Sequence, residues 1–298
     1  MQDCYTEADM VIQAFAKINW SLDIVGQRED GYHLMDMLMQ SVSLADEIIL
    51  SPAASLFITT GGWPPSRADQ SNLAYRAALA LKNVTGYTGG ASIHLDKHIP
   101  VGAGMGGGSS DAAAVLIGLN RMWKTGLTDV NLEQIGLSLG ADVPFFIRGG
   151  LTRTRGIGEI LQTCEYLYNY WLVIIQPCPG LSTAQVFSLF HQSGIASRPD
   201  TDQALYALKT GNLNLLCGSI GNVLQPVSET LRPEIVRCCA DLVSAGAVTS
   251  LMTGSGSAVF GVFRSAAEAE KAYRKLSSGY RSAFLCHTQH DSIRISEE

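Results

Sequence analysis

The strongest chemical signal in the sequence is a glycine-rich segment near its middle. Residues 100–111 read Pro-Val-Gly-Ala-Gly-Met-Gly-Gly-Gly-Ser-Ser-Asp. Glycines leave the backbone N–H groups uncovered and allow positive φ angles. An apolar helical pattern follows directly, and the free N–H groups and dipole at the start of a helix attract anions. The segment therefore predicts a phosphate-binding loop, with Ser109 and Ser110 placed to cap the helix and to donate hydroxyls to phosphate or to metal-bound water.

Two other glycine-loop motifs fit this segment less well. The spacing Gly102-x-Gly104-x-x-Gly107 satisfies a dinucleotide-binding fingerprint, but that fold needs a second strand with an acidic end about 20 residues further on. Residues 120–124 instead read Asn-Arg-Met-Trp-Lys and lead into another helix. A Walker-type loop needs a lysine after its last glycine, and Gly108 is followed by Ser109. A surface loop without a ligand is the remaining alternative, and the long apolar helix behind the segment argues against it.

Two charged residues elsewhere are candidates for chemistry on a phosphoryl group. Asp142 follows a helix stop at Gly140 and lies among apolar neighbours, although an aspartate there could equally cap a helix or a turn. Lys17 lies in a strictly alternating segment and shares a face with Asn19, about 7 Å further along a strand. A solvated outer face explains that alternation equally well, so the residue pattern alone leaves both roles open.

Composition limits the class of protein. Of the 298 residues, 46% are hydrophobic and 16% are charged, which supports a core in two modest domains or one large one. The net charge of −6, without a run of Lys and Arg, argues against nucleic acids and anionic membranes as partners. We expect no signal peptide, because the first residues lack a basic region, and no apolar run is long enough to span a bilayer. Seven scattered cysteines without a C-x-x-C pair indicate free thiols in a reducing compartment, so we expect a cytoplasmic protein.

The elements that must position these residues occur in clusters rather than in regular alternation. Period-two patterns predict strands at 33–42, 47–50, 56–60, 91–95, 172–175, 248–252, 258–263 and 282–286, and on both sides of the turn at 156–158. Residues 12–24 predict a strand, or a bent pair of strands, with one face in the core. Helices are predicted at 72–86, 111–123, 132–139, 183–190, 202–210, 233–245 and 266–276. This order predicts an α+β fold with two lobes, residues 1–160 and 161–298.

Seven segments, in order along the chain, resemble the GHMP kinase superfamily. They are Ala16-Lys-Ile-Asn19, Asp30-Gly-Tyr-His33, Asn72-Leu-x-x-Arg-Ala-Ala78, Lys97-x-Ile-Pro100 with the glycine loop, Gly140-Ala-Asp-Val-Pro-Phe145, Gly180-Leu-Ser-Thr183 and Thr253-Gly-Ser-Gly256. Within the superfamily, the first two segments resemble the 4-diphosphocytidyl-2-C-methyl-D-erythritol kinases. The sequence departs from that family's pattern at Leu34, at Gln225 and at Ser257-Ala258.

The resemblance implies a reaction and a fold. ATP would phosphorylate the 2-hydroxyl of the cytidyl-linked methylerythritol, on the non-mevalonate route to isoprenoid precursors. The fold would be the two-lobed GHMP kinase fold, in which the N-terminal lobe is like domain 2 of ribosomal protein S5 and the C-terminal lobe is ferredoxin-like. The two substrates would bind in the cleft between the lobes, and Mg²⁺ would be held mainly through ATP rather than by the protein.

The resemblance also implies roles for individual residues. Lys17 and Asp142 would be the catalytic pair, with the lysine holding the carboxylate ionised and aimed at the substrate hydroxyl. ATP would be bound by Asn72, Lys97, Pro100, Val101, Gly102, Ala103, Gly104, Met105, Gly106, Gly107, Gly108, Ser109 and Ser110. The cytidyl substrate would be bound by Asn19, Tyr32, His33 and Phe187, although core packing explains Phe187 about as well. Another GHMP substrate of the mevalonate or homoserine type, or a nucleotide-binding module that has lost catalysis, stays open as an alternative, and so does the choice between monomer and homodimer.

Overall fold

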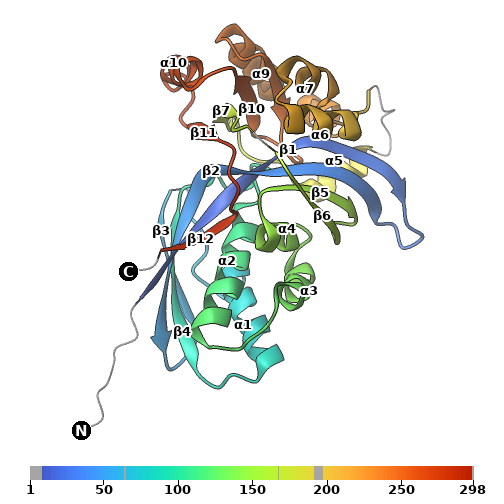
Figure 1. The fold of residues 1–298 in the computed structure, drawn as a ribbon. Helices are drawn as coiled ribbons and strands as arrows, with labels where there is room; N and C mark the ends of the chain where they lie inside the picture. Colours follow the sequence, from blue (N-terminus) through green and yellow to red (C-terminus); the bar gives the residue numbers. More distant parts are fainter. Residues whose placement is uncertain (1–8, 64, 167, 191–196, 297–298) are drawn as a thin grey trace.

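The computed structural model describes residues 9–63, 65–166, 168–190 and 197–296, and these ranges contain two β-sheets. The first sheet has eight strands, and its main path runs in the order β12-β1-β2-β4-β3. Its members are β1 (Met10–Gln27), β2 (His33–Ala53), β3 (Phe57–Gly62), β4 (Gly90–Lys97), β5 (Leu151–Gly156), β6 (Ile160–Cys164), β8 (Gly221–Asn222) and β12 (Ile293–Ser296). Four helices lie on one side of this sheet (Figure 1): α1 (Leu73–Thr85), α2 (Gly107–Met122), α3 (Asp129–Leu139) and α4 (Val143–Arg148).

The second sheet is antiparallel and lies with its helices above the first (Figure 1). Its four strands run in the order β11-β7-β10-β9. They are β7 (Trp171–Ile175), β9 (Thr249–Met252), β10 (Val259–Phe263) and β11 (Ala283–His287), with α5 (Thr183–Phe190), α6 (Thr201–Thr210), α7 (Leu213–Ser219), α8 (Gln225–Leu231), α9 (Glu234–Ser244) and α10 (Ala266–Leu276). Both β8 and β12 pair with β1, so the chain beyond residue 160 returns twice to the first sheet. The expected lobe boundary at that residue stays a prediction.

Strand β1 determines where the polar residues of the site point. The prediction of a strand is confirmed, but the prediction that only one face is buried is wrong. Ile12, Ala14, Leu22 and Ile24 pack in one hydrophobic core, whereas Ala16, Ile18 and Trp20 pack in the other. The register with β2 shifts between Phe15 and Ala16 and again between Asn19 and Ser21, and each such irregularity can turn the following side chains to the opposite face. Alternation then places Lys17 and Asn19 on the face opposite to Ala16, Ile18 and Trp20.

The predicted helix starts differ in accuracy. Asn72 caps α1 as expected, because its side chain accepts a hydrogen bond from the Ala74 N–H at 2.9 Å. Helix α2 begins at Gly107 rather than at Asp111, and its N-cap, Gly106, makes no side-chain hydrogen bond. The prediction that Ser109 and Ser110 cap this helix is therefore wrong, since both lie in its first turn.

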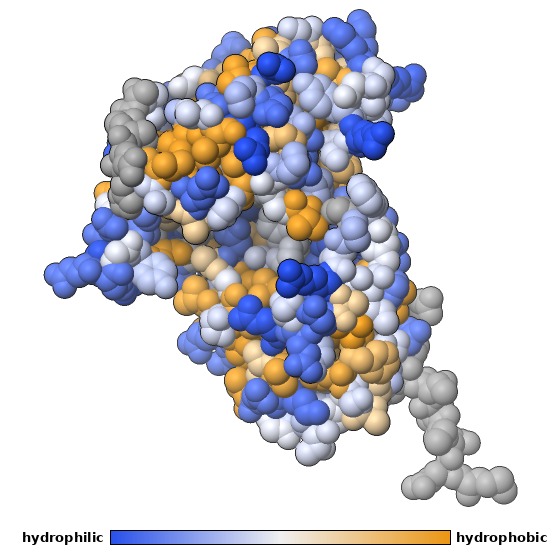
Figure 2. All heavy atoms as spheres, turned by 180° about the vertical axis from the view of Figure 1, so that it is seen from behind, coloured by the Kyte–Doolittle hydropathy of each residue, from blue (hydrophilic) through white to orange (hydrophobic). Residues whose placement is uncertain are grey.

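The remaining differences concern short or merged elements. The strands predicted at 33–42 and 47–50 form the single strand β2. Five elements of seven residues or fewer, α4, α7, α8, β8 and β12, were not predicted, because they are too short to show a clear period. None of the helices within the described ranges is long and apolar enough to cross a membrane. On the face shown in Figure 2, hydrophobic residues form separate patches among hydrophilic ones.

Candidate active site

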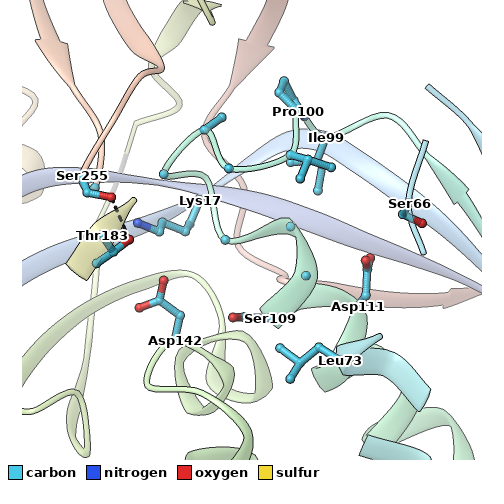
Figure 3. Close-up of a pocket in the computed structure, with 18 of the residues that line it drawn as sticks. Lys17, Ser66, Leu73, Ile99, Pro100, Ser109, Asp111, Asp142, Thr183 and Ser255 are labelled. Carbon is cyan, nitrogen blue, oxygen red and sulfur yellow. Dashed lines mark hydrogen bonds between the residues drawn. The ribbon is translucent and has the colours of Figure 1, made fainter. Parts of the chain in front are cut away.

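A cavity of about 690 Å³ is lined by residues from both lobes. Figure 3 shows several of these residues around the glycine loop. The cavity is lined by eleven of the residues predicted to bind ATP: Asn72, Lys97, Pro100, Val101, Gly102, Ala103, Gly104, Gly106, Gly107, Gly108 and Ser109. The two others, Met105 and Ser110, are buried and do not line it. Ser110 instead donates its hydroxyl to the Phe15 carbonyl oxygen at 2.7 Å, so the predicted hydroxyl contact with phosphate is not available in this arrangement.

The glycine loop lies against two turns of the C-terminal lobe by backbone contact. A Cβ atom at Gly104 would overlap the carbonyl oxygen of Thr253, and one at Gly180 would overlap the carbonyl oxygen of Gly102. Only glycine permits such an approach. The 180–183 and 253–256 segments, which both resemble the superfamily, therefore fix the position of the glycine loop.

Lys17 is a buried residue that lines the cavity. Its Nζ donates to Asn19 Oδ1 at 2.7 Å, and its backbone N–H donates to the Met105 carbonyl oxygen at 3.0 Å. Burial lowers the pKa of Lys17, and the opposite charge of Asp142 counteracts that effect. In Figure 3 the Lys17 ammonium and the Asp142 carboxylate point toward one another. They form no ion pair among the interactions of the described residues, so a substrate group can lie between them.

Asp142 stands at the N-cap position of α4, but its side chain makes no capping hydrogen bond. The alternative that this carboxylate caps a helix is therefore wrong. Gly140, the helix stop that preceded it in the sequence, ends α3. The short connection between α3 and α4 thus presents Asp142 to the cavity, which it lines.

Asn19 ties Lys17 to the second lobe. Its Oδ1 also accepts from the Thr253 hydroxyl at 3.2 Å and from the Gly254 N–H at 3.1 Å. Its side-chain nitrogen lies 3.7 Å from the sulfur of Met37. Asn19 lines the cavity, and its predicted contact with substrate stays a prediction.

The other residues predicted to bind the cytidyl substrate are only partly brought together. Phe187 lines the cavity, and its ring lies against that of His33, with centroids 4.9 Å apart. His33 itself is not part of the cavity wall, and Tyr32 is 61% exposed at the tip of the β1–β2 hairpin. Phe187 also packs against the hydrophobic core, so the core-packing alternative is confirmed, and its contact with the substrate stays a prediction.

Sequence reasoning missed a buried ionic network beneath the glycine loop. Lys97 donates to Asp46 and, at 2.5 Å, to Asp111. The Oδ1 atom of Asp46 accepts from the backbone N–H groups of His98 and Ile99, which lead into the loop. An ammonium has three donors, so one N–H of Lys97 remains for the cavity. Asp46 had no sequence signal, because it lies in an ordinary strand far from the loop.

This network predicts a pH dependence of stability. Burial raises the pKa of Asp111 to about 7, with Lys97 counteracting and Asp46 adding to the effect. Because the pKa is higher in the folded than in the unfolded chain, the proton-linked stabilisation is complete below about pH 4 and is lost as the pH rises through 7. In Asp111→Asn this loss should disappear. We expect the free energy of unfolding in urea, measured at pH 5 and pH 8, to fall by about 1–3 kcal/mol more in the wild type than in the variant. Parallel pH profiles would contradict the raised pKa.

Gln225, one of the departures from the family pattern, makes a defined contact beside the 253–256 turn. The Oε1 atom of Gln225 accepts from the Met252 N–H at 2.9 Å. Asn222 donates to the carbonyl oxygens of Met252 and Gly254 at 2.9 and 2.8 Å. Gln225 therefore supports the 253–256 turn with its side-chain oxygen, which a carboxylate could also supply.

Comparison with known proteins agrees with this geometry. The N-terminal domain of GHMP kinases matches residues 72–150, and the C-terminal domain matches residues 204–282. The 4-diphosphocytidyl-2-C-methyl-D-erythritol kinase of Alkaliphilus metalliredigens is 43% identical over 277 residues, which cover 92% of this chain and 94% of the relative. That of Clostridium tetani is 38% identical over 279 residues, which cover 94% of this chain and all of the relative.

Solved structures support the same assignment. The crystal structure of a 4-(cytidine 5'-diphospho)-2C-methyl-D-erythritol kinase superposes with a TM-score of 0.80 at 33% identity, over 94% of this chain and 99% of that one. A homoserine kinase from Cytophaga hutchinsonii superposes with a TM-score of 0.75 over 99% of both chains, but at 17% identity it shows the fold alone. The α+β, two-lobed fold that the sequence predicts is confirmed. The chain belongs to the 4-diphosphocytidyl-2-C-methyl-D-erythritol kinase family of the GHMP kinases.

Proposed function

We propose that this chain transfers the γ-phosphate of ATP to the 2-hydroxyl of 4-diphosphocytidyl-2-C-methyl-D-erythritol, on the non-mevalonate route to isoprenoid precursors. The observation that carries the proposal is the facing pair of Lys17 and Asp142 across a cavity bordered by the glycine loop. Relatives of this name match the chain over nearly its full length.

The ATP phosphates lie at the glycine loop, where the first N–H groups of α2 have no partner within the helix. Gly106, Gly107 and Gly108 line the cavity at this helix start, and the N-terminal end of the helix dipole favours negative charge. Asn72 and Lys97 line the part of the cavity that continues from the loop, which suits the nucleoside.

Mg²⁺ fits this site as a companion of ATP. The phosphates would supply most of its ligands. Within the described ranges, no group of three His, Cys, Asp or Glu side chains could hold a metal ion by itself. The Ser109 hydroxyl lines the cavity in the first turn of α2 and is placed to bind a metal-bound water. Bound there, the ion neutralises phosphate charge.

Asp142 and Lys17 then act on the acceptor hydroxyl. Asp142 has no capping bond to satisfy, so its carboxylate is available to orient the hydroxyl and to accept its proton. Lys17 supplies positive charge beside the transferring group, and Asn19 holds its ammonium in place. Phosphoryl transfer depends largely on such positioning and charge neutralisation.

The cytidyl half of the acceptor lies toward Phe187 and His33. Phe187 offers its ring to the cavity and rests on His33. His33 and Tyr32 would contact the base from the β1–β2 hairpin, and Asn19 lies near the hydroxyl that receives the phosphoryl group.

We further propose a cytoplasmic location, in keeping with the free cysteines at 164, 178, 217, 238, 239 and 286. We also propose that the protein is a monomer or homodimer and that it has no nucleic-acid or membrane partner.

Transfer of radiolabelled phosphate from ATP tests this function. The acceptors are 4-diphosphocytidyl-2-C-methyl-D-erythritol, mevalonate and homoserine. We expect kcat/KM for the cytidyl alcohol to exceed that for the other two by at least about 10²-fold, because a site built to hydrogen-bond one substrate rejects analogues that lack its groups. Preference for mevalonate or homoserine, or no transfer to any acceptor, would refute the proposal.

A further inference from the structure

Two aspartates stand directly opposite each other on the β1–β2 hairpin. Asp23 of β1 and Asp36 of β2 are register partners, so their side chains share one face of the sheet. Like charges in directly opposite positions destabilise a strand pair. Both carboxylates are largely shielded from water, with side chains only 11% and 17% exposed, so each needs a cation.

Two arginines from outside the hairpin supply those cations. Arg153 of β5 binds Asp36 with two parallel hydrogen bonds of 2.8 and 2.6 Å, and it also reaches Asp202 of α6 at 2.5 Å. Such bidentate, charge-assisted pairs fix orientation as well as charge. The hairpin is thereby attached to a helix of the second lobe, and Figure 1 shows the outer part of β1 and β2 passing next to α5 and α6.

The second arginine acts on the neighbouring strand. Arg198 donates to Asp23 at 2.5 Å and to the Ile24 carbonyl oxygen at 2.9 Å. Close by, the Thr201 hydroxyl at the start of α6 donates to the Ser21 hydroxyl at 3.0 Å. Both strands of the hairpin are therefore held from the side of the second lobe.

The opposite face of the same hairpin forms part of the cavity. Leu22 and Met37 are the next register pair along the strands, and both line the cavity. Because neighbouring pairs point to opposite faces, a shift of Asp23 and Asp36 moves Leu22 and Met37 with it. Strand β2 begins at His33, which supports the ring of Phe187.

We propose that Arg153 and Arg198 are positioning residues for the alcohol substrate: they neutralise the facing pair Asp23 and Asp36 and hold the hairpin against the second lobe. This inference rests on the proposed function for its substrate, since Leu22, Met37 and Phe187 are assigned to the acceptor side of the cavity. Among the described residues, no hydrogen bond or ion pair joins the glycine loop, Asn72 or Lys97 on the ATP side to these ion pairs.

Removal of both arginines tests the proposal. In Arg153→Gln/Arg198→Gln, we expect KM for the cytidyl alcohol to rise about tenfold, because the coupling lost between contacting charges is of this order, while KM for ATP changes less than about twofold. Adding Asp23→Asn and Asp36→Asn to this variant removes the repulsion and should restore most of the loss. A role of the arginines in packing alone predicts no such rescue. Arg274→Gln, which breaks an exposed pair with Glu270 on α10, is the matched control and should change neither KM.

Amide hydrogen exchange of residues 20–38 in the ligand-free proteins gives a second measurement. Exchange should be faster in the double arginine variant and return toward the wild type in the fourfold variant. Unchanged exchange, an unchanged KM for the alcohol in the folded double variant, or an equal rise of both KM values would overturn the inference. Failure of the proposed function is distinct, because it would be seen as absent turnover by the wild type while the exchange result still decides the role of the arginines.

Discussion

Asp142→Asn is expected to lower kcat by at least about 10²-fold, because loss of a general base costs roughly 10²–10⁴-fold in rate. The substitution keeps size and shape but removes the charge and the ability to accept a proton. Since the Asp142 side chain makes no capping hydrogen bond, the change should cost little stability. ATP affinity should change little, because the proposed ATP site is the glycine loop and not this carboxylate. Steady-state kinetics with the cytidyl alcohol, together with an ATP titration, measure both quantities.

Three further variants test this expectation. Lys17→Ala should lower kcat to a similar extent, and the double variant should be little worse than either single one if the pair acts as a unit. Asp200→Asn is a matched control, because Asp200 also stands at an N-cap but does accept a hydrogen bond, from the Gln203 N–H of α6. Asparagine caps equally well, so this control should be near wild type in kcat and stability. Near-normal kcat in Asp142→Asn would show that Asp142 is a turn residue without a catalytic role.

The sequence was most informative where a local rule decides the structure. The Asn72 cap of α1 follows from residue type at a helix start. The phosphate-binding loop was predicted from glycine spacing alone, and most of it lines the cavity. Lys17 and Asp142 were proposed through the resemblance, and their geometry across the cavity accords with that role, although their catalysis stays a prediction.

The features that could not be predicted depend on partners far along the chain. Nothing near Asn19 indicates that its side chain binds Thr253, 234 residues away. Alternation along β1 suggested one buried face, because sequence periodicity does not show the register shifts that turn the strand. The sequence predicted Ser110 as a phosphate ligand, but in the fold its hydroxyl donates to the Phe15 carbonyl oxygen. Likewise, the sequence does not show that Lys97 forms ion pairs with Asp46 and Asp111, because only the fold places the three side chains together.

Gly106→Val is expected to weaken ATP binding by more than about 10²-fold in a folded protein, since we propose that the loop supplies most of the phosphate contacts. Gly106 has a φ of 72°, which a β-branched residue strongly disfavours. A Cβ atom there would lie 2.6 Å from the ring of Phe146 and 3.3 Å from Cγ of Lys17. Phe146 is fully buried, so the loop is the part that must move.

The matched control for this substitution is Gly126→Val. Gly126 has nearly the same φ, 71°, but a Cβ atom there meets no other atom within 4 Å. Both variants therefore carry the backbone strain, of about 1–2 kcal/mol, and only Gly106→Val adds the collision beside the phosphate site. Calorimetric ATP titration should separate them, with Gly126→Val close to wild type, and thermal unfolding should show both to be folded. If Gly106→Val proves too unstable, Gly106→Ala carries the same collision in milder form. A folded Gly106 variant that binds ATP as tightly as its Gly126 counterpart would remove the glycine loop from the nucleotide site.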